Sequence, residues 1–135
     1  MRIVFGLFLL AHGLIHASYL SPEPPPTEGA PQWPFSMGRS WLVTGLGLDV
    51  GIVRTMGTLL VIIVVVGCAL SGLAWLGIVI PAEWWPGLVI GSASASLVLL
   101  AAFFHPWIVL GFAIDGALLW IALGASWQAE LASTP

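Results

Sequence analysis

The chain has 135 residues, of which 59% are hydrophobic and only 7% are charged, and its formal net charge is −3 at pH 7. Soluble domains carry about 25% charged residues, so this composition excludes an ordinary soluble fold and predicts one integral membrane domain over residues 1–135. The three basic residues are scattered, which excludes nucleic acid as a partner because phosphate binding needs a basic cluster. The expected surroundings are a lipid bilayer, and the single Cys68 rules out an internal disulfide.

Four apolar segments are long enough to cross a bilayer as helices, which takes roughly 17 to 25 residues. They cover residues 3–20, 52–79, 85–104 and 107–127. The first segment begins like a signal peptide, with Met1-Arg2 before an apolar run, but it lacks a small-x-small pair near its end. It is therefore predicted to be retained as a membrane span.

The only sizeable polar stretch lies between the first and second spans. Residues 21–37 are too proline-rich for a helix and predict a semi-rigid, polyproline-like strap. Residues 38–48 mix apolar side chains with arginine, serine and threonine, which favours a short helix at the membrane interface. Asp49 is a predicted N-cap for the second span, and Pro81 and Glu83 are start signals for the third.

The later connections are short, so neighbouring spans are predicted to run antiparallel. The pair His105-Pro106 breaks the last connection, because a residue before proline avoids helical backbone angles. The predicted fold class is an all-α integral membrane protein, a four-transmembrane-helix up-and-down bundle with a proline-rich loop and a short interfacial helix between helices 1 and 2. Arg2 ahead of an apolar run favours a cytoplasmic N-terminus, in the plasma or inner membrane.

Ionisable side chains within the spans are the strongest sign of a site, because a charge in hydrocarbon is costly and rare. At about 1.5 Å of rise per residue, nearly all of them lie in the half of the bilayer nearest the strap. On a helical wheel His12 and His16 share one stripe, while Gly6 and Gly13 lie on a separate small-residue stripe that lets another helix approach. The predicted polar pocket consists of His12, His16, Tyr19, Arg54, His105 and Asp115.

Three interpretations of this pocket stay open. In the first, it is a structural network in which Asp115 accepts a hydrogen bond from His12, because buried polar groups must find partners. In the second, an Asp–His pair exchanges a proton with the headgroup of a quinone. In the third, His12, His16 and His105 hold a single metal ion. Haem is disfavoured, because two histidines on one helix face cannot take opposite axial positions.

The remaining polar residues and motifs predict less. Ser92, Ser94 and Ser96 fall in the middle of the third span, where small residues favour close helix packing. The sequence has no glycine-rich phosphate loop, nucleophile elbow, HExxH motif or cysteine pair, which excludes a hydrolase or kinase and argues against an autonomous enzyme. A small-solute or proton transporter is a third functional alternative, weakened by the shortage of ionisable residues in the far half of the bundle.

The first span carries one family resemblance. The run Gly6-Leu-Phe8-Leu-Leu-Ala-His12-Gly13 is similar to the first-helix pattern of the DoxX family of small four-helix bacterial membrane proteins. Members are associated with membrane oxidoreductase systems, including small subunits of thiosulfate:quinone oxidoreductase. The resemblance implies an accessory or quinone-linked redox subunit, working with a membrane protein partner or as a homo-oligomer. In that role His12 and Asp115 would handle a proton and Arg54 would hold an anionic or carbonyl oxygen.

The alternative from a different class is a non-catalytic membrane binding or assembly protein. In that case the polar cluster serves only to order the bundle.

Overall fold

The fold is given by a computed structural model that describes residues 2–25, 27–29 and 31–133, with the backbone alone described from residue 126 onward. The described part is all-α and contains no strand. Its α-helices are α1 (Arg2–His16), α2 (Trp41–Thr44), α3 (Val50–Leu76), α4 (Trp85–Ala102) and α5 (Val109–Ser133). Short 3₁₀ turns extend α1 to Leu20 and precede α4 and α5.

Four of the helical segments are long and apolar enough to cross a bilayer, as the sequence predicts. They are Arg2–Leu20, Val50–Leu76, Ala82–Ala102 and Pro106–Ala125. Many of their large apolar side chains point outward, including Leu110 at 69% exposed and Trp120 at 81% exposed. An outward apolar surface of this extent is characteristic of helices that contact lipid.

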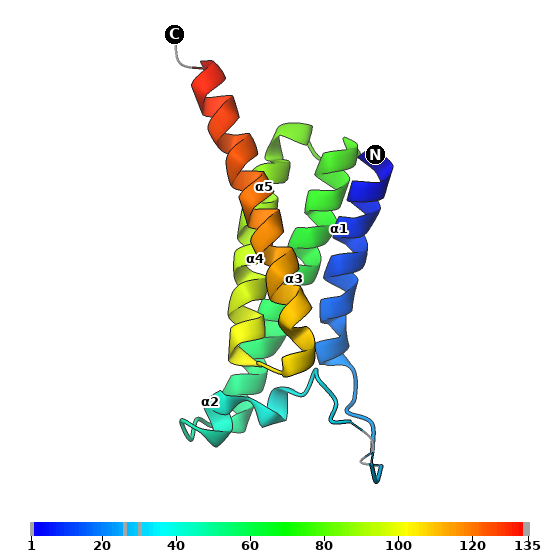
Figure 1. Ribbon diagram of the computed structural model, residues 1–135, viewed down its shortest axis with the longest axis vertical. Helices are drawn as coiled ribbons and strands as arrows, with labels where there is room; N and C mark the ends of the chain where they lie inside the picture. Colours follow the sequence, from blue (N-terminus) through cyan, green and yellow to red (C-terminus); the bar gives the residue numbers. More distant parts are fainter. Residues whose placement is uncertain (1, 26, 30, 134–135) are drawn as a thin grey trace.

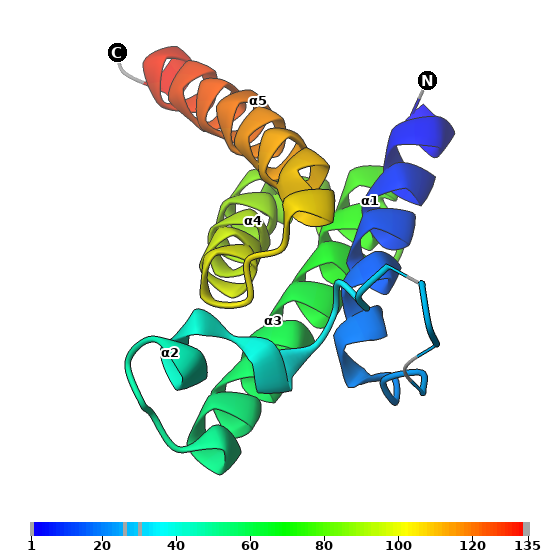
Figure 2. The same cartoon turned by 60° about the horizontal axis from the view of Figure 1, so that its bottom comes forward.

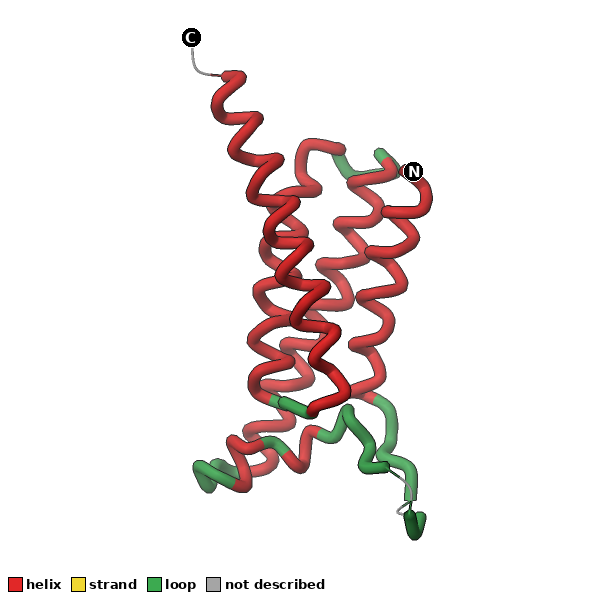
Figure 3. The backbone as a smooth tube through the Cα atoms, in the orientation of Figure 1, coloured by secondary structure: helices red, strands yellow, loops and turns green. Residues whose placement is uncertain are grey.

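The long helices pack side by side in the order α1, α3, α4, α5, so α3 and α4 are central and α1 and α5 lie outside (Figure 1). Both chain ends lie at one end of the bundle, and α5 projects beyond its neighbours there (Figure 1). The connection between α3 and α4 lies at this end too, whereas the segment between α1 and α3, with α2, and the turn between α4 and α5 lie at the opposite end (Figure 1, Figure 3). Seen from that end, the chain leaves α1, crosses toward α3 and passes through α2 before α3 begins (Figure 2).

The helix ends follow local sequence signals, and several differ from the predicted boundaries; α3 begins at Val50 rather than at residue 52, and α5 continues to Ser133 rather than ending at residue 127. Asp49 caps α3 as predicted, because its Oδ1 accepts from the backbone N–H groups of Gly51 and Ile52 at 2.9 and 3.0 Å. The same helix ends at Leu76 rather than at residue 79, because Gly77 takes a left-handed φ of 70° and closes the last turn. The helix α4 ends at Ala102 rather than at residue 104.

The predicted interfacial helix over residues 38–48 is shorter in the structure, where only Trp41–Thr44 is α-helical. Ser40 starts it, with a hydroxyl that accepts from Leu42 N–H and donates to the Ala102 carbonyl at 2.5 Å. Trp41 Nε1 donates to the carbonyl of Ala101 at 2.8 Å. The segment therefore docks on the last carbonyls of α4, where these two side chains supply donors that the helix end lacks.

Small residues set the closest helix approaches, as the small-residue stripe on the first span predicts. A Cβ atom built on Gly13 would lie 2.7 Å from the Cβ of Cys68, where α1 crosses α3. A Cβ built on Gly67, the residue before Cys68, would lie 2.7 Å from the Cβ of Ser92 on α4. One turn of α3 therefore contacts α1 on one side and α4 on the other, which brings three helices within reach of the same short polar side chains.

Replacing Gly13→Ala should destabilise the bundle. The added methyl group overlaps Cys68, which cannot rotate away because the clash is at its Cβ, and overpacking of this kind costs about 1–3 kcal/mol. Gly116→Ala is the matched control, because a Cβ there meets nothing within 4 Å. Unfolding in detergent with increasing denaturant measures both, and equal stabilities of the two variants would contradict this packing.

Candidate functional site

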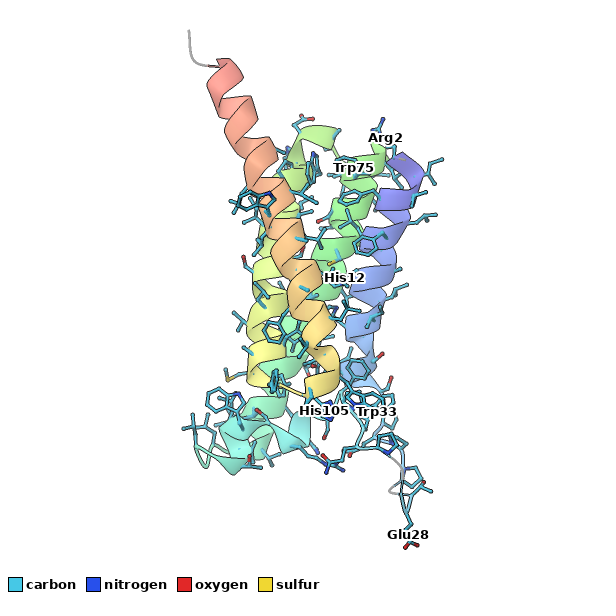
Figure 4. All side chains as sticks on the ribbon, viewed as in Figure 1. Arg2, His12, Glu28, Trp33, Trp75 and His105 are labelled. Atoms are coloured by element: carbon cyan, nitrogen blue, oxygen red, sulfur yellow. The ribbon has the colours of Figure 1, made fainter. Side chains whose placement is uncertain are left out.

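The two histidines of α1 lie inside the bundle, as the shared stripe predicts. Both His12 and His16 are 3% exposed, and one turn of helix separates them. Asp115 on α5 and Ser96 on α4 are fully buried opposite them. Figure 4 shows His12 about midway along the bundle, so these polar groups lie far from either end.

Four hydrogen-bond contacts join these side chains in a closed ring, which we call the His–Ser–Asp network (His12, His16, Ser96 and Asp115). His12 Nε2 lies 2.8 Å from Asp115 Oδ1, and Ser96 Oγ lies 2.5 Å from Asp115 Oδ2. Ser96 Oγ also lies 2.7 Å from His16 Nε2, and His16 Nδ1 lies 3.0 Å from the His12 carbonyl oxygen. Three helices, α1, α4 and α5, therefore meet at one polar centre.

The ring limits where its protons can be. A carbonyl oxygen only accepts, so His16 Nδ1 must carry a proton and donate it to His12. His12 Nε2 donates to Asp115 Oδ1, because at least one of these two atoms must supply a proton and the imidazole is the ordinary donor. The Ser96 hydroxyl has one proton for two neighbours, so it donates to one of them and accepts from the other.

Two proton arrangements satisfy all four contacts without any net charge. In one, Ser96 donates to the neutral His16 and accepts from a protonated Asp115. In the other, His16 is an imidazolium that donates to Ser96, which in turn donates to the Asp115 carboxylate. Two short proton shifts through the Ser96 hydroxyl convert one arrangement into the other. A proton can therefore move between Asp115 and His16 while the net charge of the network stays zero.

The same side chains are also of metal-ligating types. One ligand atom each from His12, His16 and Asp115 lie within 4.8 Å of one another, so these three residues could hold an ion between α1 and α5. The His16 Nδ1 contact to a backbone carbonyl would leave Nε2 as the ligand. The third ligand in such a metal site would be Asp115 and not His105, which the sequence interpretation named, because His105 lies at the loop end of the bundle (Figure 4).

His105 has a local structural role. Its Nδ1 accepts from the backbone N–H of Trp107 at 3.2 Å, which caps the turn before α5. In Figure 4 it lies near Trp33 and away from His12. The structure therefore separates His105 from the two histidines of α1.

Tyr19 and Arg54 form a second location, also apart from the network. Both line a pocket of about 330 Å³ beneath the proline-rich strap. The predicted six-residue pocket is thus divided in three, with His12, His16 and Asp115 at the bundle centre, Tyr19 and Arg54 under the strap, and His105 at the turn.

Ser96 is the network residue that the sequence interpretation missed, because it assigned the serines of the third span to packing. A signal was present, since Ser96 and Asp115 lie at nearly equal distances along the chain on either side of His105. In a helical hairpin that turns at His105, the two residues must therefore lie at similar depth.

An apolar groove of about 980 Å³ lies toward the end of the bundle that holds both termini, and none of its described lining residues belongs to the network. Its walls include Phe5 and Phe8 of α1, Trp75 of α3 and Ile121 of α5. The Phe8 ring stacks on the His12 ring with centroids 6.0 Å apart. Phe8 therefore lies between the groove and the network.

Reciprocal hydrogen bonds join two residues that line the groove. Arg2 Nε donates to the Trp75 carbonyl at 2.8 Å, and Trp75 Nε1 donates to the Arg2 carbonyl at 3.0 Å. These bonds tie the start of α1 to the end of α3, so the groove has a fixed boundary there.

Comparison with known proteins gives no match: no family model, no curated protein and no solved structure is similar to this chain. The DoxX-like resemblance of the first span therefore stays a prediction.

Ser96→Ala should lower the free energy of unfolding by about 1–3 kcal/mol, because it leaves buried groups of His16 and Asp115 without their hydrogen-bond partner. Ser94→Ala is the control, since Ser94 is exposed on the same helix and its loss should change stability by less than about 0.5 kcal/mol. Denaturant titration in a fixed detergent measures the difference. Equal effects at the two positions would show that the ring does not stabilise the bundle.

Proposed function

We propose that this chain is a multi-pass protein of the plasma or inner membrane, built as a four-span up-and-down bundle with a cytoplasmic N-terminus. In this proposal it is an accessory, quinone-linked redox subunit whose His–Ser–Asp network handles protons. Electrons come from the redox centre of a partner membrane protein, because the chain's own side chains supply only proton chemistry. The composition, the four apolar helices and the DoxX-like first span support this assignment.

The observation that carries the proposal is the closed hydrogen-bond ring of the network. A quinone that is reduced takes up protons together with electrons, so its site needs a group that donates a proton and can be reloaded. We assign the donor role to His12, whose ring lies beside Phe8 at the groove wall. When the network holds one extra proton, His12 would be an imidazolium that gives its Nδ1 proton to an oxygen of the reduced quinone. The neutral network that remains keeps the Nε2 proton on the Asp115 contact, with Ser96 and His16 in either of the two arrangements above.

The groove suits the apolar parts of a quinone, its ring and its prenyl chain. Its surface is predominantly apolar and aromatic, which favours a prenyl chain and a flat headgroup. Arg54 is separated from this groove by the length of the bundle, since it lines the pocket under the strap. The role of holding a quinone oxygen, which the sequence interpretation gave to Arg54, therefore does not belong to this arrangement.

Asp115→Asn tests the relay with little change in shape. An asparagine amide reproduces the neutral arrangement, since its oxygen accepts from His12 and its NH₂ group donates to Ser96, but it cannot release a proton. We expect the variant to fold with near-normal stability and to lose the carboxyl signal in infrared difference spectra recorded when a short-chain ubiquinone analogue is reduced in nanodiscs.

Asp49→Asn is the matched control for that experiment. It removes the same charge from an exposed helix cap where asparagine also caps well, so its difference spectrum should equal that of the unmodified protein. An unmodified protein that binds no quinone analogue, or shows no carboxyl signal on reduction, would overturn the redox proposal. Stoichiometric metal in the purified protein that is lost in His16→Ala would replace it with a metal site.

A purely structural role is the second candidate, and one observation favours it: the network is complete and joins three helices. In this case the protein is a non-catalytic binding or assembly protein of the membrane. The network then contributes through the coupling of its members rather than through proton transfer, because each side chain satisfies the next.

A double-mutant cycle on His12→Ala and Asp115→Ala measures that coupling. We expect an interaction energy of about 0.5–3 kcal/mol, because the two side chains are in direct contact. The control cycle pairs His105→Ala with Asp115→Ala and should show additivity, since these residues share no contact. A cycle with no coupling would contradict the structural role, whereas strong coupling without any quinone response would favour it over the redox role.

A further inference from the structure

A second polar location lies beneath the strap, between residues 20–23 and 35–38 and the first turns of α3. It is a pocket of about 330 Å³, and the lining residues that matter here are Tyr19, Glu23, Ser36, Gly38, Arg54 and Thr58. None of them belongs to the His–Ser–Asp network. A ligand bound in this pocket is therefore independent of the proposed redox function.

The strap is held over this pocket by its own charges. The Glu23 carboxylate forms an ion pair with Arg39 through Oε1 and accepts a hydrogen bond from Ser36 Oγ at 3.0 Å through Oε2. Both carboxylate oxygens are thus engaged, and the negative charge has its own counterion. Glu23 consequently fixes the pocket wall without neutralising another cation.

Arg54 is the cation left over. Arg2 donates to a backbone carbonyl and Arg39 pairs with Glu23, whereas the exposed Arg54 has no hydrogen-bond or ion-pair partner among the residues that the structure describes. Its Nη2 lies over Gly38, 3.3 Å from where a Cβ would be. A guanidinium offers five donors in a planar fork that matches carboxylate and phosphate oxygens.

The Tyr19 hydroxyl is a second, independent sign. Tyr19 lines the same pocket and is only 4% exposed, and its OH has no partner in the described ranges. Its ring makes an edge contact with Phe35 at 5.1 Å and a tilted contact with Phe103 at 5.9 Å between centroids. A buried hydroxyl without a partner costs about 1–3 kcal/mol, and a ligand oxygen would recover that cost.

We propose that the strap pocket binds an oxyanion, a phosphate or carboxylate group, between Arg54 and Tyr19. Arg54 supplies the charge and a bidentate donor pair, and the Tyr19 hydroxyl supplies a third donor. The Thr58 hydroxyl lies one turn after Arg54 on the same helix and lines the same space. The oxyanion comes either from a free ion or from the headgroup of an acidic lipid.

The test compares thermal unfolding midpoints of the full chain in nanodiscs. One arm titrates inorganic phosphate into phosphatidylcholine discs, with sodium chloride at matched ionic strength as the reference. The other arm replaces phosphatidylcholine by phosphatidylglycerol without added phosphate. We expect the midpoint to rise in at least one arm, because a ligand that binds only the folded state stabilises it. The arm that responds identifies the source of the oxyanion.

Two variants connect that response to the pocket. Arg54→Gln should weaken the apparent affinity about tenfold or more, because it removes charge-assisted hydrogen bonds. Tyr19→Phe removes only a hydroxyl and should weaken it about threefold, so it remains informative if Arg54→Gln does not fold. Arg2→Gln is the control, since it removes the same charge at the opposite end of the bundle.

The expected pattern is loss of the response in Arg54→Gln, partial loss in Tyr19→Phe and an unchanged response in Arg2→Gln. An unmodified protein that responds in neither arm would overturn the proposal. So would an equal loss in Arg54→Gln and Arg2→Gln, because that result would reflect net charge rather than this pocket.

Discussion

The Asp115 carboxyl group is fully buried in a bundle whose outer surface is apolar, and its need for hydrogen-bond donors constrains the whole arrangement. An unpaired carboxyl in such surroundings costs several kcal/mol. The hydrogen-bond partners of Asp115 are Ser96 on α4 and His12 on α1. The rotation of α5 is therefore fixed relative to two helices, α4, on which it packs, and α1, on the other side of the bundle. The side chains that lock the helices in register are therefore the same ones that form the candidate site.

The close packing of α3 makes that arrangement reachable. Gly67 and Cys68 are adjacent in sequence and face α4 and α1 respectively, so a single turn brings both neighbours near the bundle axis. Serine and aspartate side chains are short, and Ser96 and Asp115 reach their partners because the backbones approach closely. A bulkier residue at position 67 or 68 would push the neighbouring helix away from α3. The polar side chains would then be too far apart to form their hydrogen bonds.

Periodicity and the scarcity of polar residues made part of this structure predictable from the sequence. The four apolar helices, the Asp49 cap, the small-residue face of α1 and the pairing of His12 with Asp115 all follow from such patterns. Depth along a helix can be counted, but the direction in which a side chain points around the bundle depends on packing. For that reason depth alone grouped Arg54 with the histidines, although Arg54 lines the pocket under the strap and the histidines lie in the network.

Ser96 escaped prediction for a different reason. Serine is common wherever membrane helices pack closely, so its chemistry is recognised only when a partner is known to face it. The early end of α3 was hidden in a similar way, because the left-handed conformation of Gly77 interrupts a run that stays apolar up to Ile80. Both features depend on local geometry that composition does not encode.

The reciprocal bonds between Arg2 and Trp75 have a consequence for how a ligand reaches the apolar groove. They hold two of its lining residues in place, and another lining residue, Val4, is an exposed apolar side chain on the outer surface of the bundle. In the proposed bilayer placement a ligand therefore enters sideways from the hydrocarbon rather than from water. Occupancy would then follow the mole fraction of the ligand among membrane lipids, and a sparingly soluble molecule could saturate the groove at negligible aqueous concentration.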